Sequence, residues 1–490
     1  MRNLYAKYET INQDLNQETR WATLEEIKRS TTHINLTDET YRTSGIPIVC
    51  DGHDAYVDGQ DTHTLIFGAT GSKKTRLFCM PVVNMYIKAG ESFIVTDPKG
   101  EIFRKTSGMA KESGYKTIVL NFRDIGKGNM WNPLSLPQKK YHSGEQDEAV
   151  SLFNDFITSI MAKHQNTKDP FWNQQASALA LANLLLLAES AEPEEVNVAS
   201  LTALCSRSAI GHLQELYSRM DKNSIAAVNY STTVSLPDRT LDCVLGELYS
   251  AIRIFNIQQN LTNMLSGSDF DVAMFGREKT AVYLIIPDEK STFHFLASVF
   301  IKQAYEVLIA EAQREKNNEL PVRVNFVLDE FCNMPTIPDM SAMISAARSR
   351  NMRFVIVAQS LHQLKGRYGE DAESIKGNCE NRVFLTSKEL DLLKETSELC
   401  GSYLDHNGRV RSLISVSELQ RLDKTKGEAL IMQGRNYPVI SELPDIDSYE
   451  MFGGYDPIPL EEIEMPAASV FDIEEFTDQV VCEKRPAPFA

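Results

Sequence analysis

Short apolar runs alternate with amphipathic segments along most of the chain after residue 60. The first of these runs are TLIFG from Thr64, SFIVTD (Ser92–Asp97) and KTIVLNF (Lys116–Phe122), all rich in β-branched residues. Apolar residues at helical spacing follow each run. This alternation predicts an α/β fold in which helices cover both faces of a parallel sheet.

The pattern changes between Phe171 and about Thr262. Apolar residues recur there at helical spacing, through QQASALALANLLLLAESA and LDCVLGELYSAIRIFNIQQNL, and the strand pattern disappears. Strand patterns then resume at Thr280–Asp288, Val322–Phe331, Met352–Ser360, Asn381–Ser387 and Gly427–Gly434. We therefore expect one sheet that is interrupted by an inserted all-α domain.

The longest apolar run is too short to cross a membrane. This run, Ala178–Ala188, falls well below the roughly 20 residues that a spanning helix needs, so we interpret it as part of a buried core helix. The N-terminus is polar, without a signal peptide. The eight cysteines are far apart and form no Cys-x-x-Cys pair, as in reduced cytoplasmic proteins. We expect a cytoplasmic protein without a transmembrane segment in this chain.

The formal charge of −17 is unevenly distributed. From Ser441 to the C-terminus there are thirteen acidic and two basic residues, whereas the remaining 440 residues carry a net charge of only −6. Because acidic clusters alternate with prolines after Pro444, we predict that residues 444–490 form a tail without a fixed fold. The nearly neutral body neither excludes nor indicates binding of nucleic acid at a locally basic surface.

The stretch GATGSKKT, from Gly68 to Thr75, resembles the phosphate-binding loop G-x-x-x-x-G-K-[ST]. A strand leads into it and an amphipathic helix follows, the context in which backbone N–H groups bind phosphates. The position of the last glycine holds Lys73, and if the backbone there needs a positive φ, a non-glycine residue costs on the order of 1–2 kcal/mol. Taken alone, the loop would also fit a glycine-rich turn unrelated to nucleotides.

The candidate phosphate-binding residues are Gly68, Ala69, Thr70, Gly71, Ser72, Lys73, Lys74 and Thr75. Among them Lys74 would supply positive charge, and the hydroxyl of Thr75 would bind Mg²⁺.

A second motif is VNFVLDEF (Val324–Phe331), an apolar strand that ends in Asp329–Glu330. An aspartate there can hold Mg²⁺, and the following glutamate can orient and deprotonate an attacking water. Acids after a surface strand are common, but four apolar residues among the five before Asp329 indicate a buried strand whose carboxyl end faces a ligand. Together the two motifs predict a P-loop ATPase that uses ATP and Mg²⁺.

Three further polar residues follow within SAMISAARSRNMRFVIVAQS. Gln359 ends the strand, where it is placed to sense the γ-phosphate. Arg348 or Arg350, on the preceding helix, could reach the nucleotide of a neighbouring subunit as an arginine finger. A solvated helix face explains the two arginines equally well.

Several motifs occur in order around the two nucleotide motifs, and they are TRWAT (Thr19–Thr23), ESFIVTDPKGE (Glu91–Glu101), WNPL (Trp131–Leu134), DPFW (Asp169–Trp172) and LDEFCNMPTIPDM. With them the sequence resembles, from about residue 18 to 440, the TraG/TraD-type coupling proteins of type IV secretion and conjugation. The resemblance places the Walker A and B residues at Lys74–Thr75 and Asp329–Glu330. Asp97 and Lys99 of TDPKGE are expected at the ligand edge of the sheet, without an assigned chemical role.

This resemblance implies a RecA-like, hexameric P-loop ATPase that delivers single-stranded DNA and its attached relaxase to the secretion channel. It also implies an all-α domain at the cytoplasmic mouth of the ring. On this interpretation the chain comprises an N-terminal polar segment (1–60), two parts of a nucleotide-binding domain (61–170 and 263–443), the all-α insertion (171–262) and the acidic tail (444–490).

The sequence departs from the family at Lys73 and at its N-terminus, where members usually have transmembrane helices. We therefore expect a separate membrane subunit that anchors the protein at the cytoplasmic face of a bacterial membrane, or else a trimmed, soluble relative. Two other functions stay open: a substrate receptor or scaffold that binds nucleotide with little or no hydrolysis, and a double-stranded DNA pump of the FtsK/HerA type. The Asp329–Glu330 pair disfavours the scaffold, and TDPKGE disfavours the pump.

Overall fold

The computed structural model describes residues 19–162, 170–405 and 407–489. The first 18 residues of the polar N-terminal segment and Asp169 of the DPFW motif lie outside the described residues. The chain divides into two compact units. The sheet unit comprises Met1–Val119, Val272–Ser291 and Ala304–Pro459, and the helical unit comprises Leu120–Asp271, Thr292–Gln303 and Leu460–Ala490.

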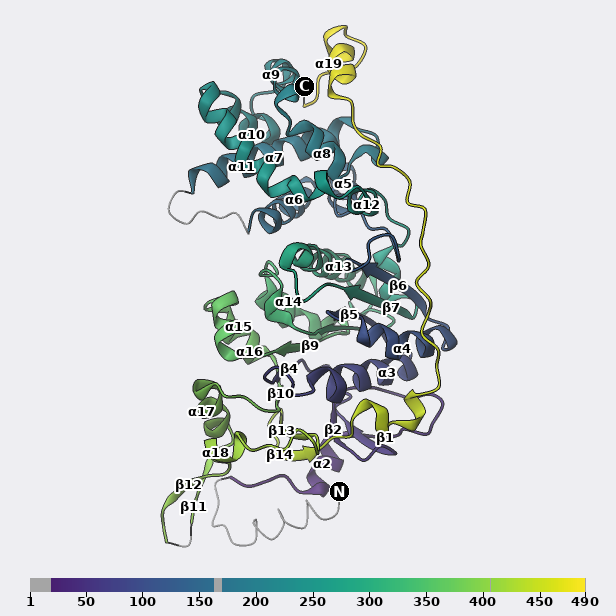
Figure 1. The fold of residues 1–490 in the computed structure, drawn as a ribbon, viewed down its shortest axis with the longest axis vertical. Helices are drawn as coiled ribbons and strands as arrows, with labels where there is room; N and C mark the ends of the chain where they lie inside the picture. Colours follow the sequence, from purple (N-terminus) through teal and green to yellow (C-terminus); the bar gives the residue numbers. More distant parts are fainter. Residues whose placement is uncertain (1–18, 163–169, 406, 490) are drawn as a thin grey trace. The chain divides into compact units, whose positions relative to one another are not determined.

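A nine-stranded sheet with the order β14-β13-β10-β4-β9-β8-β5-β7-β6 is the main feature of the sheet unit (Figure 1). Its strands are β4 (Thr64–Phe67), β5 (Ser92–Asp97), β6 (Lys116–Asn121), β7 (Thr280–Ile285), β8 (Val324–Leu328), β9 (Met352–Ala358), β10 (Asn381–Phe384), β13 (Glu428–Gln433) and β14 (Val439–Glu442). All strands predicted after residue 60 are present. The six strands from β10 to β7 run parallel, but β13 and the unpredicted β14 are antiparallel, so the expectation of a wholly parallel sheet was wrong at this edge.

Helices cover both faces of the sheet, as the sequence predicts. The helices between strands are α3 (Met80–Ala89), α4 (Glu101–Glu112), α13 (His294–Arg314), α14 (Met340–Ala347), α15 (Leu361–Tyr368) and α16 (Asp371–Asn378). The connections through α3 and α4 cross the sheet in one direction, and those through α13 to α16 cross it in the other. Since parallel crossovers are right-handed, the two sets lie on opposite faces (Figure 1).

One stretch among the described residues, Ser291–Arg314, is long and apolar enough to cross a membrane by length and composition. However, 78% of the most apolar part of this stretch is buried inside the protein. The core helix of a globular protein has this combination of composition and burial.

Smaller elements surround the sheet. They are α2 (Leu24–Ser30), the antiparallel strands β1 (Thr32–Asn35), β3 (Asp54–Val57) and β2 (Pro47–Cys50), the hairpin β11 (Ser402–Leu404) and β12 (Val410–Ser412), and the helices α17 (Leu390–Leu399) and α18 (Val416–Leu419). Helix α2 and the strands β1, β2 and β3 therefore all lie within the polar N-terminal segment, 1–60. Thr23 of TRWAT caps α2 in a reciprocal capping box with Glu26.

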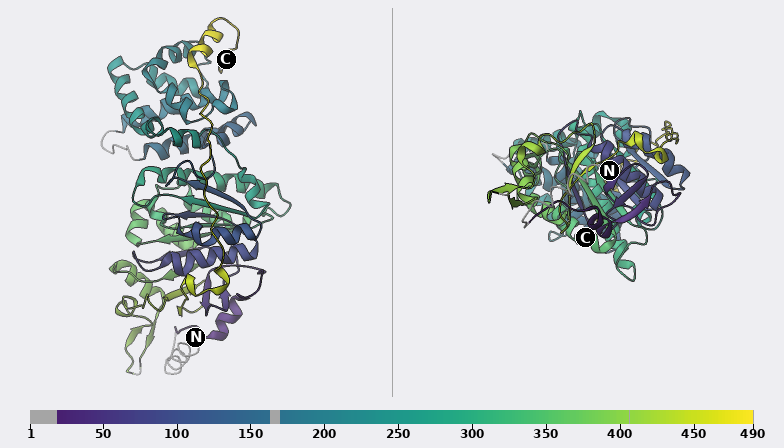
Figure 2. Two further views of the ribbon diagram at one scale, coloured as in Figure 1. Left: turned by 45° about the vertical axis from the view of Figure 1, so that its right-hand side comes forward. Right: turned by 90° about the horizontal axis from the view of Figure 1, so that it is seen from below.

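The helical unit is built around α7 (Phe171–Ser190), which contacts α6, α8, α10 and α11. Its other helices are α5 (Ser135–His142), α6 (Gln146–Met161), α8 (Val198–Leu204), α9 (Ile210–Arg219), α10 (Ile225–Val234), α11 (Asp238–Ile257) and α12 (Gln259–Met264). Leu184–Leu187, within the predicted core helix, are all buried, because α7 is surrounded by other helices. Figure 2 shows these helices, coloured from blue to teal, grouped together, and the described residues between β6 and β7 contain no strand.

The helical unit begins at Leu120 rather than at Phe171, because α5 and α6 pack against each other and against α7. The predicted tail without a fixed fold was also wrong for the described residues after Pro444. Tyr449, Phe452 and Phe471 are buried there, and α19 (Ile473–Val481) contacts α9. Burial of these apolar side chains fixes the two ends of the segment, whereas residues 453–470 between them are largely exposed.

Candidate functional site

The phosphate-binding loop follows β4, the strand that lies between β10 and β9. The loop begins with two hydrogen bonds to its neighbours: Gly68 N–H donates to the Ala358 carbonyl (3.2 Å) and Ala69 N–H to that of Thr386 (2.8 Å). Gly68 has no room for a side chain, since a Cβ there would lie 2.4 Å from Ser72 Oγ. Gly71 has a φ of 77°, which glycine adopts without a steric cost.

Lys73 also has a left-handed backbone, with a φ of 67°. A glycine would adopt this conformation freely, whereas a lysine pays a steric cost. The loop therefore keeps the shape expected of the motif despite the unusual residue. The Lys73 ammonium lies 3.2 Å from Asp445 Oδ2.

The two motifs predicted from the sequence meet at the carboxyl ends of β4 and β8. Thr75 Oγ1 donates a 2.7 Å hydrogen bond to Asp329 Oδ2. Lys74 is almost fully buried; its Nζ donates to the Gly68 carbonyl (2.8 Å) and lies 3.8 Å from Glu330 Oε1. The fold thus gathers a cation, a hydroxyl and two carboxylates at one sheet edge, where ligands bind in open α/β sheets.

Asp329 is 4% exposed, and burial raises its pKa to about 6, against the opposing hydrogen bond from Thr75. Its backbone carbonyl accepts a hydrogen bond of 2.8 Å from Thr96 Oγ1 on the adjacent strand β5. A buried carboxylate of this kind is stabilised by a nearby cation. The side chain is therefore suited to Mg²⁺ chemistry.

Glu330 and Gln359 connect the ends of β8 and β9. Gln359 Nε2 donates to Glu330 Oε2 (2.5 Å), and its Oε1 accepts from Thr70 Oγ1 (3.3 Å). Glu330 itself has a left-handed backbone, with a φ of 52°, a strained conformation of the kind found at functional sites. Gln359 therefore bridges the phosphate-binding loop and the candidate catalytic carboxylate.

Arg348 and Arg350 lie away from this cluster, in a short 3₁₀ turn that precedes β9. Gln359 follows the other end of β9. The seven residues of this strand span about 20 Å at the usual rise per residue. Arg348 forms an ion pair with Glu380. Neither arginine reaches the loop of its own chain, so an arginine-finger role requires a second subunit.

Asp97 is fully buried at the end of β5, next to β8. Its Oδ2 accepts a 2.8 Å hydrogen bond from the backbone N–H of Phe103 in the first turn of α4. Burial raises the pKa of this carboxyl to about 6. Asp97 thus stabilises the start of α4, and Lys99 is exposed in the intervening turn.

An ion cluster that no sequence motif predicted lies beside the loop and is made of Lys73, Arg76, Lys105, Asp445 and Asp447. Arg76 is the second residue of a π-helical turn, Thr75–Cys79, and forms ion pairs with Asp445 and Asp447. Lys105 Nζ lies 2.8 Å from Asp447 Oδ1. The acidic composition of the tail indicated that it could form ion pairs, but composition does not show which basic residues the acidic side chains contact.

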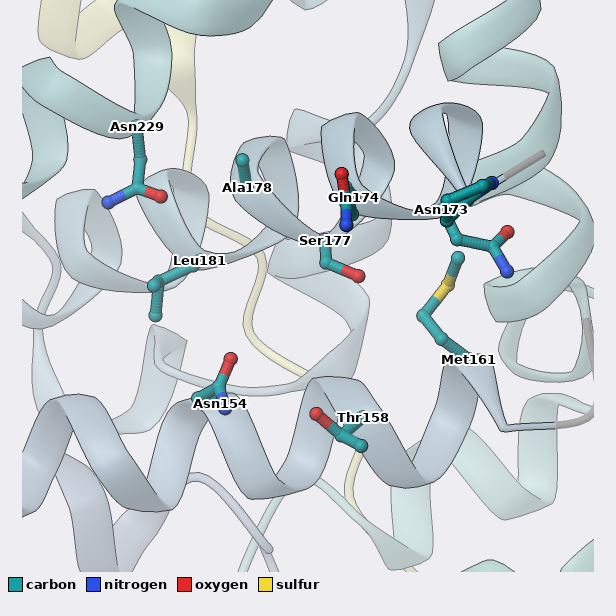
Figure 3. Close-up of a pocket in the computed structure, with 10 residues that line it drawn as sticks. Asn154, Thr158, Met161, Asn173, Gln174, Ser177, Ala178, Leu181 and Asn229 are labelled. Carbon is teal, nitrogen blue, oxygen red and sulfur yellow. The ribbon is translucent and has the colours of Figure 1, made fainter. Parts of the chain in front are cut away.

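The helical unit contains a separate pocket of about 470 Å³ between α6, α7 and α10 (Figure 3). Its polar lining residues are Asn154, Thr158, Asn173, Gln174, Ser177 and Asn229. None of its described lining residues is charged, so it offers no ammonium or guanidinium group to phosphates. The described residues also contain no cluster of three or more His, Cys, Asp or Glu side chains that could hold a metal. The Thr75–Asp329 pair is therefore the candidate for Mg²⁺, which commonly takes few protein ligands beside phosphates.

Comparison with known proteins identifies a family. Residues 20–412 match the family described as "Type IV secretory system Conjugative DNA transfer". Conjugal transfer protein TraG of Escherichia coli is 25% identical over 406 residues, covering 76% of this chain and 62% of TraG. Protein VirD4 of Rhizobium radiobacter is 23% identical over 417 residues, covering 77% of this chain and 56% of VirD4. The chain spans about three fifths of the length of these relatives.

Solved structures of the plasmid coupling protein TrwB are also similar. The complex of TrwB with the ATP analogue ADPNP has a TM-score of 0.64 and 14% identity, and the match covers 92% of this chain and 98% of TrwB. The complex of TrwB with ADP and Mg²⁺ has a TM-score of 0.60 and 13% identity, covering 93% and 97%. This likeness confirms the predicted fold of the RecA-like P-loop NTPase class.

Proposed function

We propose, from the premise that this chain belongs to the type IV secretory system conjugative DNA transfer family, that it is an ATP-hydrolysing coupling protein. In this proposal it recruits single-stranded DNA with an attached relaxase, or a protein substrate, and moves it into the secretion channel. The observation that carries the proposal is the meeting of Lys74 and Thr75 with Asp329 and Glu330 at one sheet edge.

The residues present fit a nucleotide with Mg²⁺. Ser72 Oγ is buried in the loop without a hydrogen-bond partner among the described residues, which leaves it available to a ligand. Lys74 would hold the phosphates, and Thr75 and Asp329 would hold the metal. ATP with Mg²⁺ supplies a phosphoryl group whose transfer to water releases free energy. TrwB, whose fold is similar, has been solved with a nucleotide analogue and with ADP and Mg²⁺.

In the hydrolytic step, Glu330 accepts a proton from the attacking water at its carboxylate. Gln359 donates to the same carboxylate and so holds it in place, and its link to Thr70 makes its position sensitive to the loop. We assign Arg348 or Arg350 to the neighbouring subunit's site, since both lie at the far end of β9. This assignment needs a ring, and the homo-hexamer expected from the family would provide one.

The proposed partners are single-stranded DNA, relaxosome proteins and components of the type IV secretion channel. A protein of this function works at the cytoplasmic face of a bacterial membrane, where a separate anchor subunit could hold it. Phosphate contacts by basic loops would make DNA binding independent of sequence and strongly dependent on salt.

ATP hydrolysis with and without single-stranded DNA tests this proposal. We expect the wild type to hydrolyse ATP, faster with DNA, and Glu330→Gln to bind nucleotide with hydrolysis reduced at least about 100-fold. Glu112→Gln, the same change at an exposed side chain at the C-terminal end of α4, serves as the matched control. If the wild type and Glu330→Gln hydrolyse equally little but both bind nucleotide, the protein is a receptor or scaffold instead.

A further inference from the structure

We infer that Asp445 is a positioning residue for the phosphate-binding loop, which it holds in its binding conformation through Lys73. The inference rests on the proposed nucleotide binding of this loop. It assigns a role to a residue that lies 370 positions from the loop in sequence, in the segment after the last strand of the sheet.

The loop needs such support because of its strain. Lys73 has a φ of 67°, a conformation that a lysine leaves readily if nothing holds it. A loop that spends part of its time in other conformations binds ligand more weakly, in proportion to the fraction that is competent. An external contact that favours the left-handed conformation therefore raises the apparent affinity.

Asp445 provides that contact. Its Oδ2 lies 3.2 Å from Lys73 Nζ, while Arg76 Nε donates to Oδ1 at 2.9 Å and to Oδ2 at 3.0 Å. Hydrogen bonds, first from Arg76 and then from Lys73, hold the pKa of the Asp445 carboxyl at about 2 although partial burial opposes this shift. The carboxylate is therefore ionised at neutral pH and has a fixed orientation.

The segment that carries Asp445 is itself anchored. Ile446, Tyr449 and Phe452 are buried, and the rings of Tyr449 and Phe452 stack with centroids 5.1 Å apart. Further along, the Asp456 carbonyl packs against Gly108 of α4 so closely that a Cβ at Gly108 would lie 2.2 Å from it. Asp445 is thus attached to the folded sheet unit and can hold Lys73 in place.

Asp447 provides a matched control. It belongs to the same ion cluster and forms ion pairs with Arg76 and Lys105, but the contacts described for it do not include Lys73. Replacing either aspartate with asparagine removes one negative charge near the loop, which favours an anionic ligand in both variants. Asp445 also accepts from Arg76 Nε and caps the following 3₁₀ turn, so only a difference between the two variants that disappears when Lys73 is replaced by glycine reports the contact with Lys73.

The test is a calorimetric titration of the full chain with ADPNP and Mg²⁺. Wild type and Lys74→Ala first establish the site: we expect binding in the former and none in the latter. Asp445→Asn and Asp447→Asn are then compared with each other, both in the wild-type background and in Lys73→Gly. A glycine at position 73 adopts a positive φ without help, so it should make Asp445 unnecessary.

We expect Asp445→Asn to bind roughly three- to tenfold more weakly than Asp447→Asn in the wild-type background, and equally in the Lys73→Gly background. Equal affinities in the wild-type background, a tighter Asp445→Asn, or a difference that persists with Lys73→Gly would each overturn the inference. If the wild type does not bind, or Lys74→Ala binds as well as the wild type, the proposed nucleotide site fails and the inference falls with it.

Discussion

Burial favours the neutral form of Asp329, at the carboxyl edge of the sheet, and of His63, at the opposite edge. Asp329, with its pKa raised to about 6, is still a carboxylate at neutral pH, and the nearby Lys74 favours this ionised form against the effect of burial. His63, just before β4, has its pKa lowered to about 4, mainly by burial and then by the nearby Arg348 and Arg353. The two shifts have the same origin but different consequences.

His63 predicts a pH dependence of stability. Its neutral ring accepts a hydrogen bond at Nδ1 from Phe354 N–H (3.0 Å) and donates from Nε2 to the Ile344 carbonyl (2.8 Å). Below pH 6.5, the ordinary pKa of histidine, His63 is protonated in the unfolded chain. In the folded protein it stays neutral until the pH falls to about 4. The contribution is therefore complete above pH 6.5 and is lost as the pH falls towards 4, by up to about 3 kcal/mol.

Denaturant unfolding between pH 7 and pH 4.5 measures this effect. We expect His63→Gln to be less stable at pH 7 but to lose less unfolding free energy on acidification than the wild type. Parallel pH profiles for the two proteins would show that another group causes the dependence.

At the scale of elements, α19 shows how an acidic segment becomes ordered. Asp472 accepts hydrogen bonds from the backbone N–H groups of Glu474 and Glu475 and so caps the helix, while Phe476 and Val480 are buried. The charged residues occupy the exposed side, as in an ordinary amphipathic helix. Composition alone predicted disorder here, because it does not register this periodicity.

Phe476→Ala should release α19. Phe476 is 5% exposed and packs with Phe471 at a centroid distance of 5.3 Å, so its removal costs about 3 kcal/mol of local stability. We expect amide hydrogens of α19 to exchange roughly 100-fold faster in this variant. Val481→Ala, at a side chain that is 42% exposed, should leave exchange nearly unchanged, and equal effects of both changes would contradict the packing described.

At the scale of the whole molecule, the residues after Leu443 serve both units. Residues up to Pro459 belong to the sheet unit, and the rest belong to the helical unit, where Phe471 N–H donates to Ser200 Oγ (2.9 Å). A single terminal segment therefore contributes separately to two folded cores. Loss of this segment should therefore change both the nucleotide affinity and the stability of the helical unit, and shortened chains can separate the two effects.

We expect a chain that ends at Pro459 to keep the nucleotide affinity of the wild type, because it retains Asp445, whereas a chain that ends at Leu443 loses part of that affinity. Both shortened chains should expose the surface of α9 that α19 covers, and both should lower the thermal stability of the helical unit. Calorimetric unfolding and ADPNP titration of the two chains measure these effects. Unchanged stability in both would mean that the tail is dispensable, as its composition suggested.

The local pattern was sufficient for most of the secondary structure. The predicted strand Ser92–Asp97 coincides with β5, and the leucine-rich run lies within α7, since hydrophobic periodicity reflects which side of an element faces the core. The boundary of the helical unit was misplaced because the packing of α5 and α6 on α7 is a contact between segments, which no local pattern records. The antiparallel direction of β13 was missed for the same reason.

By itself, the sequence determined the α/β class, the order of the strands' appearance along the chain and the residues of the two nucleotide motifs. These depend on periodicity and on short motifs whose chemistry is local. Only the tertiary structure decided that Gln359 bridges Thr70 and Glu330, that Arg348 and Arg350 lie at the other end of β9, and that Asp445 contacts Lys73. The physical reason is that these relations join residues that chain folding, and not sequence proximity, brings within hydrogen-bonding distance.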